Sequence, residues 1–203
     1  SSATVYTPKI FSAIKEKDNL YINSVYGFTK KTIEDLIYLK SKIFKFDYII
    51  LRYFNPAGCH KTGLLGEDNN KVPNNLYPYI GSIIQKKQKY LKIFGKNYKT
   101  SDGTGARDYI HIEDLAETHV KSLNLLKKKR NIREILNIGC GKAITVKTVI
   151  NSFKKYCNYE IKFKYYPRRH GDLDKIYTEN NKAKKILNWK PKKGLKEIAI
   201  STY

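Results

Sequence analysis

A tyrosine and a lysine stand four residues apart, at Tyr26 and Lys30, near the start of a helical run. A helix places positions i and i+4 on one face, so the phenol and the ammonium can point into the same site. The pKa of a tyrosine hydroxyl is near ~10 in water, and a neighbouring cation lowers it by favouring the phenolate. Such a pair can act as a general acid/base. The spacing alone favours a chance pair on a solvated helix, because the chain has 17 Tyr and many Lys.

The segments around this pair predict an α/β fold. Residues 1–6 are expected to form the end of a buried strand, and residues 24–44 carry apolar side chains at helical spacing. Residues 47–53 form a nearly continuous apolar run, which is typical of a central parallel strand buried on both faces. Strand, helix and strand in this order predict a parallel sheet. Its ligands are expected in the loop after the strand, which begins at Asn55.

The rest of the chain continues this alternation. We expect helices from an Asn cap at 74–75 to about 89, from Asp114, from a cap at Thr145 to about 156, and over 180–187 and 195–203. Strands are expected at 91–95, 107–112, 135–138 and 159–166. Gly139 and Gly141 could admit a phosphate to the backbone, but G-x-G-x-x-G is incomplete because Ile144 stands at the third glycine.

Composition bounds the function. The chain has 203 residues, 41% of them hydrophobic, with no membrane-spanning apolar run, so we expect a soluble protein. Its net charge of +22 would suit nucleic acid or an acidic membrane, but Lys is spread through almost every segment. Arg is rare, and four of the six lie in motif segments, which points to anion recognition, with structural ion pairs as the alternative. These four are Arg52, Arg107, Arg168 and Arg169.

Cysteine and histidine usage argues against disulfides and metals. Cys59, Cys140 and Cys157 are widely spaced and odd in number, so a reducing, cytoplasmic compartment is expected. None of the four His pairs with another His or a Cys at ligand spacing. We therefore expect no metal site.

A family resemblance follows from the ordered segments SSATVY, YGFTK, LRYFNPAG, PNNLYPYI, IFG, DGTGARDYIH, NIGCG and PRRHGD. Their order and spacing resemble the UDP-galactose 4-epimerases of the extended short-chain dehydrogenase/reductase group, from residue 1 to about 189. The resemblance implies α/β architecture: part of an NAD-binding Rossmann-type parallel sheet plus a smaller α/β domain that binds the UDP-sugar. Residues 1–58 and 107–141 would belong to the first domain, and residues 59–106 and 142–203 to the second.

The resemblance also implies roles for individual residues. Tyr26 matches the base that takes the proton of the sugar 4-hydroxyl while hydride passes to NAD, and Lys30 matches the lysine that holds the nicotinamide ribose. Ser2 matches a hydroxyl that hydrogen-bonds the 4-oxygen, and Tyr53 and Phe54 would lie against NAD. The residues implied in UDP-sugar binding are Asn55, Asn74, Asn75, Leu76, Phe94, Arg107, Tyr109, Arg169 and Asp172.

Three departures from the family pattern matter. The Gly-rich dinucleotide motif is missing, so we expect a part of a longer, homodimeric protein that does not hold NAD by itself. Thr7 replaces the usual glycine after SSATVY. Ile176 stands where side-chain size decides whether N-acetylated sugars fit, and its intermediate size leaves that question open.

Two other functions remain open. The first is another NAD-dependent sugar-nucleotide epimerase or a 4,6-dehydratase. The dehydratases share the fold but carry acidic residues just after the position of Ser2, where this chain has Ala3 and Thr4. The second alternative, a basic module that binds nucleic acid or a membrane surface, rests on the net charge alone. We expect no nucleic-acid partner for the main function.

Overall fold

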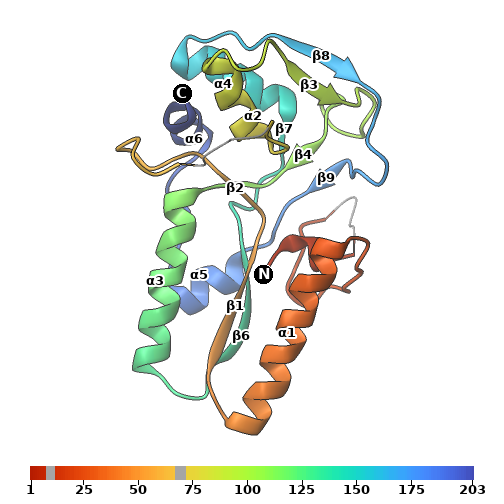
Figure 1. The fold of residues 1–203 in the computed structure, drawn as a ribbon. Coiled ribbons are helices and arrows are strands. Elements are labelled where there is room, and N and C mark those ends of the chain that lie inside the picture. The colour runs from red at the N-terminus through yellow and green to blue at the C-terminus, as the bar shows by residue number, and fades with distance from the viewer. Residues whose placement is uncertain (8–11, 67–71) are drawn as a thin grey trace.

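The computed structural model describes residues 1–7, 12–66 and 72–203, and the expected α/β fold is confirmed. Figure 1 shows the elements in an upper and a lower group, joined by short strands. The lower group holds α1 (Val25–Phe44), β1 (Tyr48–Tyr53), α3 (Ile112–Lys128), β6 (Arg133–Ile138) and α5 (Asn181–Leu187). The upper group holds α2 (Leu76–Ile84), β3 (Leu91–Phe94), α4 (Val146–Cys157), β8 (Phe163–Tyr166) and α6 (Leu195–Thr202).

The lower group is built on a parallel strand pair, β1 and β6, in which Leu51 lies opposite Leu136. Both side chains are buried, as expected for strands covered on both faces. Ala183 and Leu187 of α5 pack into the same cluster. Helix α5, which falls within residues 142–203 of the expected second domain, therefore packs against the parallel pair.

Residues 1–6 differ from the expected strand. Ser2 pairs with Tyr53 in an isolated parallel bridge, Tyr6 pairs with Leu20 in an isolated antiparallel one, and a short 3-10 helix, η1 (Ala3–Val5), lies between them. The Ser2 hydroxyl accepts a hydrogen bond from the backbone N–H of Thr4 at 3.3 Å. Such local side-chain to backbone bonds compete with strand pairing, which explains the turn.

Short strands join the two groups: β2 (Asn55–Ala57), β4 (Ala106–Arg107), β5 (Tyr109–His111), β7 (Ile144–Thr145) and β9 (Lys175–Ile176). β2 pairs in parallel with β5, while β4 lies between β7 and β9. The strand expected over 107–112 is thus two strands interrupted at Asp108.

The buried carboxylate of Asp108 explains that interruption. It accepts backbone N–H bonds from Cys140 at 2.7 Å, Gly141 at 2.9 Å and Thr178 at 3.0 Å. Burial raises the pKa of Asp108 to about 6, although these bonds oppose the shift. A side chain at Gly139 would come within 2.7 Å of the carboxylate. The suggestion that this turn admits a phosphate is therefore wrong, because Asp108 already fills it.

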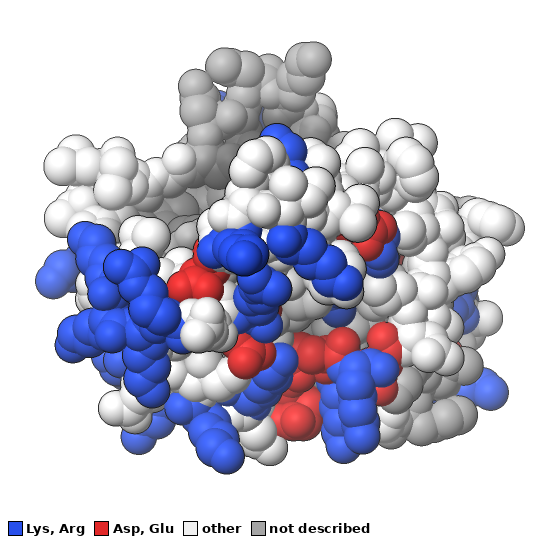
Figure 2. Space-filling model, turned by 90° about the horizontal axis from the view of Figure 1, so that it is seen from below, with Lys and Arg blue, Asp and Glu red and all other residues white. Residues whose placement is uncertain are grey.

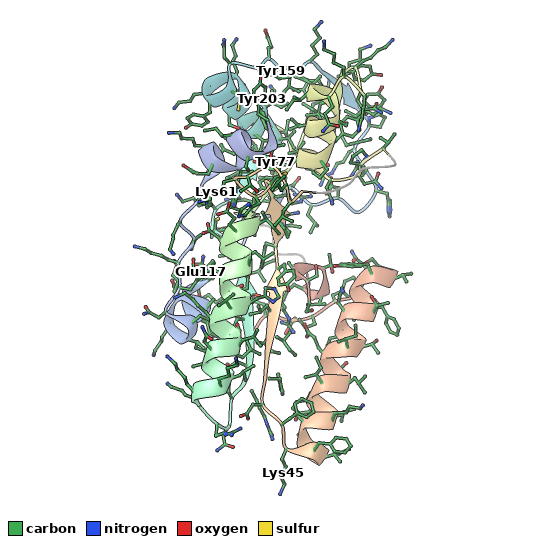
Figure 3. The ribbon with its side chains drawn as sticks, turned by 60° about the vertical axis from the view of Figure 1, so that its left-hand side comes forward. Lys45, Lys61, Tyr77, Glu117, Tyr159 and Tyr203 are labelled. Atoms are coloured by element: carbon green, nitrogen blue, oxygen red, sulfur yellow. The ribbon has the colours of Figure 1, made fainter. Side chains whose placement is uncertain are left out.

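The upper group has its own hydrophobic core, in which Ile80, Ile93 and Phe153 are almost fully buried. Tyr77 lies within it, and the rings of Tyr159 and Tyr203 meet at its far end with their centroids 5.7 Å apart (Figure 3).

Of two expected helix caps, one forms its side-chain hydrogen bond and the other does not. Thr145 caps α4 by accepting the N–H of Thr148 at 3.2 Å, as predicted. Asn75 stands at the N-cap of α2, but its side chain makes no capping bond, so that prediction is wrong. The helix also ends at Ile84, earlier than expected.

Helix α1 exposes its apolar face within this chain. Its buried residues are Gly27, Glu34 and Ser41, whereas Leu39 and Ile43 are 58% and 72% exposed.

Lys and Arg spread over much of the face seen from below, with Asp and Glu between them (Figure 2). Within the described ranges, no helix combines the length and apolarity that a membrane crossing needs.

Candidate functional site

The predicted acid/base pair lies on the first turns of α1. Ser24 starts the helix by accepting the N–H of Gly27 at 3.0 Å. The Lys30 Nζ atom lies 5.2 Å from the centre of the Tyr26 ring, so the structure brings the two side chains together as their spacing predicted. The Tyr26 side chain remains 55% exposed and open to a ligand.

The segment that contains Ser2 approaches the start of α1 through a close backbone contact. A Cβ atom at Gly27 would lie 2.9 Å from the carbonyl oxygen of Thr4, so only glycine lets α1 approach η1 this closely. Ser2 is bridged to Tyr53, whose N–H donates to the Ser1 carbonyl at 3.3 Å. The structure thus gathers Ser2, Tyr26, Lys30 and Tyr53 at the carboxyl end of β1.

A cavity of about 290 Å³ opens beside this group, between α1 and α3. Its polar lining includes Ser1, Lys30, Tyr53 and His119. The Tyr53 hydroxyl lies 2.6 Å from Nε2 of His119. Burial, and secondly the nearby Tyr26, raise the pKa of Tyr53, so its hydroxyl keeps its proton.

Sequence reasoning missed His119. Its neighbours in sequence carry no ligand or catalytic spacing, and only the packing of α3 beside β1 brings it to Tyr53.

Arg52 does not have the expected role in anion recognition. Its guanidinium donates to Glu34 at 2.9 and 2.6 Å and to the Tyr6 hydroxyl at 2.8 Å, with both charged side chains almost fully buried. Arg52 therefore forms a structural ion pair and is not free to bind an anion. Burial opposes ionisation of Glu34, but its bonds to Arg52 outweigh this and hold the pKa of Glu34 below its usual value.

A second cluster gathers the other arginines around Phe94, and we call it the arginine cluster: Phe94, Tyr98, Arg107, Arg168, Arg169 and Asp172. Arg107 forms an ion pair with Asp172 and donates to the carbonyl of Leu173 at 2.8 Å. The Tyr98 hydroxyl donates to the other carboxylate oxygen of Asp172 at 2.8 Å. Burial first, and then this bond to Asp172, raise the pKa of Tyr98 to about 12.

The remaining two arginines lie over aromatic rings of this cluster. The Arg169 guanidinium is 3.9 Å from the centre of the Phe94 ring, and that of Arg168 is 4.1 Å from the Tyr98 ring. Gly95, with φ +85°, allows this arrangement, because a Cβ atom there would lie 2.4 Å from the Tyr98 ring. Tyr98 was not among the predicted site residues.

Strand β9 connects the two clusters. Ile176 lies opposite Arg107 in the β4–β9 pair. It also packs against the hydrophobic cluster that includes Phe54. Ala3, which follows Ser2, packs against the same cluster. The residue singled out for sugar size therefore lies between the acid/base pair and the arginine cluster.

Two predicted ligand residues are buried in hydrophobic cores. The Phe54 side chain is 7% exposed and packs with Val5 and Ile14, so it lies in the core. Tyr109 is 6% exposed, and its ring meets that of Tyr77 at 5.1 Å.

Four predicted ligand residues lie near the start of α2 and on β2. Asn74 and Asn75 are exposed before α2, and Leu76 packs partly against the upper core. Asn55 is half-buried on β2, where its N–H donates to the carbonyl of Asp108 at 3.0 Å.

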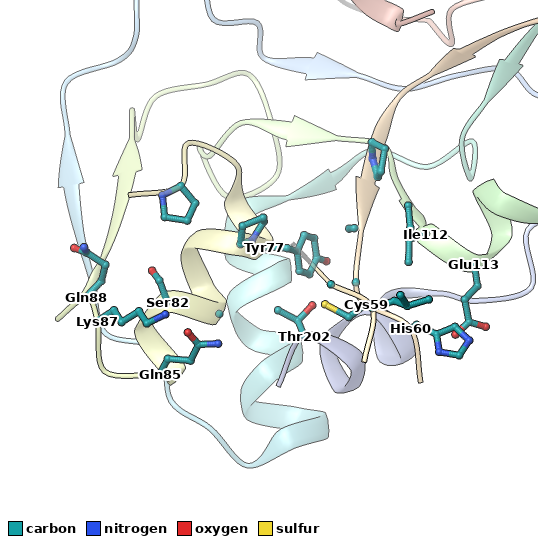
Figure 4. A pocket seen from close by; sticks show the side chains of 18 of the residues that line it. Cys59, His60, Tyr77, Ser82, Gln85, Lys87, Gln88, Ile112, Glu113 and Thr202 are labelled. Carbon is teal, nitrogen blue, oxygen red and sulfur yellow. The ribbon is translucent and has the colours of Figure 1, made fainter. Parts of the chain in front are cut away.

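A larger cavity, of about 740 Å³, lies elsewhere (Figure 4). Its lining runs from Gln85 and Gln88 at one end to His60 and Glu113 at the other. None of the predicted site residues lines it, whereas Lys30 and Tyr53 line the smaller cavity, so we place the site beside that cavity.

In the part of the chain that the structure describes, no group of three or more His, Cys, Asp or Glu side chains is arranged to hold a metal ion.

Residues 1–202 match the model of a protein family described as GDP-mannose 4,6 dehydratase. The chain belongs to this family. UDP-glucose 4-epimerase of Bacillus subtilis (strain 168) is 38% identical over 204 residues, and the match covers 100% of this chain and 60% of the relative. The chain thus spans about 60% of the length of the curated relatives it matches, and it corresponds to the C-terminal part of an extended short-chain dehydrogenase/reductase.

Two solved family structures superpose closely on the chain. UDP-glucose-4-epimerase from Stenotrophomonas maltophila, with bound NAD and formylated UDP-arabinopyranose, has a TM-score of 0.95 at 34% identity, covering 100% of this chain and 60% of that one. The enzyme from Bifidobacterium longum, in complex with NAD+ and UDP, has a TM-score of 0.91 at 36% identity with the same coverage. The resemblance noted in the sequence is confirmed.

Proposed function

We propose that the complete protein to which this chain belongs interconverts UDP-glucose and UDP-galactose by transient oxidation at C4 with bound NAD. One observation carries the proposal: Tyr26 and Lys30 share a helix face beside Ser2, and β9 links this group to the arginine cluster. The first group suits proton chemistry at a sugar hydroxyl, and the second suits a nucleotide diphosphate. The epimerases that resemble the chain, crystallised with NAD, support the assignment.

The residues at the smaller cavity fit a nicotinamide cofactor. Lys30 offers an ammonium, while Tyr53 and Ser1 offer polar atoms around an apolar interior. NAD, when bound, supplies an acceptor and store for the C4 hydride. Lys30, Tyr26 and Tyr53 would hold it, whereas the buried Phe54 would contribute its backbone.

Side chains of this chain would carry out the proton transfer at C4. Tyr26 takes the proton of the 4-hydroxyl and later returns it, and its exposed ring leaves room for the sugar. Lys30 places a positive charge 5.2 Å from the centre of the Tyr26 ring. The Ser2 hydroxyl, which now accepts only a long 3.3 Å bond from Thr4, can donate to the sugar 4-oxygen.

The arginine cluster would bind the UDP part. Arg169 lies over Phe94 and can contact the diphosphate while uracil lies against the ring. Arg107 and Asp172 form an ion pair, which fixes the guanidinium for phosphate and the carboxylate for ribose. We propose the amide side chains of Asn55, Asn74 and Asn75 as further ligands.

The test is product analysis on the full-length protein. We expect UDP-galactose to give UDP-glucose and UDP-glucose to give UDP-galactose, with no net consumption of added NAD. NMR distinguishes the two sugars. The competing reaction is 4,6-dehydration, which the description of the matching family names. A 4-keto-6-deoxy product from UDP-glucose, with no UDP-galactose, would overturn the assignment.

The remaining expectations are also proposals. We propose that the full-length protein is a homodimer in a reducing, cytoplasmic compartment; the exposed apolar face of α1 and the wide spacing and odd number of the cysteines support this. We retain the two-domain division, with α5 moved to the NAD-binding part because of its packing.

A further inference from the structure

The two faces of the two-stranded sheet of β3 and β8 differ: on one, Leu91 and Ile93 of β3 are buried, while Phe163 and Tyr165 of β8 are 39% and 40% exposed. Lys92 lies opposite Lys164 and Phe94 opposite Tyr166 in this parallel pair. Side chains alternate along a strand, and opposite residues share a face. Ile93, on the other face, is 2% exposed in the upper core. The face of Lys92, with both lysines exposed and both rings half-buried, carries lysines and aromatic rings in alternation.

These side chains are in contact, and with Tyr90 at the start of β3 we call them the Tyr/Lys face: Tyr90, Lys92, Phe94, Lys164 and Tyr166. Lys92 Nζ lies 5.4 Å from the centre of the Tyr166 ring, and Lys164 Nζ lies 4.7 Å from that of Tyr90. The two tyrosine hydroxyls are 2.8 Å apart, and the rings of Phe94 and Tyr166 are 5.9 Å apart. Each ring is thus held beside a cation or another ring.

The charge around this face is concentrated. Residues 86–99 and 160–170 contain ten Lys and Arg and one acidic residue, Glu160. Among the described residues, neither Lys92 nor Lys164 forms an ion pair, although eight other basic residues do. The bond from Tyr166 and the charges of both lysines lower the pKa of Tyr90 despite some desolvation. The local potential is therefore positive.

We propose that the Tyr/Lys face binds single-stranded nucleic acid. Proteins that bind single strands combine a positive surface for the phosphates with aromatic side chains on which bases stack. Tyr90, Phe94 and Tyr166 offer the rings, and Lys92 and Lys164 offer unpaired cations. Bases within a duplex are already stacked on one another, so rings on a sheet face favour single strands.

The Tyr/Lys face lies outside the acid/base site, so binding does not depend on the proposed epimerase activity. It adjoins the arginine cluster at Phe94, where Arg169 covers the ring. A base of the bound strand that occupies Phe94 would exclude uracil of a UDP-sugar. UDP should therefore compete with part of the bound strand.

Fluorescence anisotropy with labelled oligouridylate of about 12 nucleotides, added to the full-length protein, tests the proposal. We expect micromolar affinity, falling with salt at a log–log slope of about −0.7 for each phosphate contacted. The double variant Lys92→Gln/Lys164→Gln should weaken binding about tenfold, and Tyr90→Ala should weaken it similarly.

The matched control is Lys184→Gln/Lys185→Gln, which removes two exposed lysines from α5. It should change the affinity less than about twofold. An equal loss in the control would overturn the proposal in favour of general charge attraction. Equal affinity for duplex, tighter binding to anionic vesicles than to oligouridylate, or no binding at all would also overturn it. Epimerase activity in the lysine variants, measured in parallel, reports separately on the proposed function.

Discussion

The hydroxyl of Tyr53 and Nε2 of His119 lie 2.6 Å apart and join the carboxyl end of β1 to the middle of α3. This bond orients the Tyr53 ring at the wall of the cavity that Lys30 also lines. If the cavity holds the cofactor, Tyr53→Phe should lower turnover or NAD retention in the full-length protein about fivefold, the factor for one hydrogen bond of about 1 kcal/mol. Steady-state kinetics and the NAD content of purified protein measure this.

The control for Tyr53→Phe is Tyr38→Phe, which removes the hydroxyl of an exposed tyrosine on α1. It should leave both quantities unchanged. Equal effects of the two substitutions would remove the Tyr53–His119 bond from the account.

The buried pair of Glu34 and Arg52 predicts a pH effect on stability. Removing one partner leaves an unpaired buried charge, so Glu34→Gln should cost about 3–5 kcal/mol of unfolding free energy at neutral pH. Because the pKa of Glu34 is below its usual value, its contribution is present above the unfolded-state pKa and is lost as pH falls through the folded value. Urea unfolding from pH 7 to about 3 should show the two proteins converging at low pH; parallel curves would contradict this.

Asp108 predicts a pH effect on stability that is opposite in sign to that of Glu34. Burial raises its pKa to about 6, so the folded state holds its proton more tightly than the unfolded state. Its contribution is fully present below the unfolded pKa near ~4 and declines as pH rises through about 6. Asp108→Asn, which puts an N–H₂ group against backbone donors, should cost about 1–3 kcal/mol. That cost should shrink between pH 4 and 6, and a cost that grows over this range would contradict the account.

The arginine cluster predicts a loss of nucleotide affinity. Arg107 makes an ion pair with Asp172 and a bond to Leu173, which a lysine cannot reproduce together. Arg107→Lys should therefore weaken UDP binding about tenfold in calorimetry, with a smaller effect on turnover at saturating substrate. Lys127→Gln, at an exposed position on α3, is the control. Unchanged UDP affinity in Arg107→Lys would separate this cluster from the nucleotide.

The sequence predicted those parts of the fold that local patterns determine. Helix α1, strands β1 and β6 and the Thr145 cap follow from apolar spacing and capping chemistry, which act within a few residues. The placement of Tyr26 beside Lys30 belongs to the same class, because one helix turn fixes it.

What the sequence could not predict depends on contacts between distant segments. Arg52 meets Glu34, Asp108 fills the glycine turn, and Tyr53 meets His119 only after the chain has folded. Side-chain type therefore suggested anion recognition for Arg52, while its partner on α1 determined a structural role.

The central claim is that Tyr26 transfers the proton at C4, and Tyr26→Phe in the full-length protein tests it most directly. The substitution keeps the ring over which Lys30 lies and removes only the hydroxyl. Turnover of UDP-galactose should fall about a thousandfold, the contribution of a general base, while UDP affinity in calorimetry stays within about twofold of the original. Near-normal turnover with intact UDP binding would contradict the account.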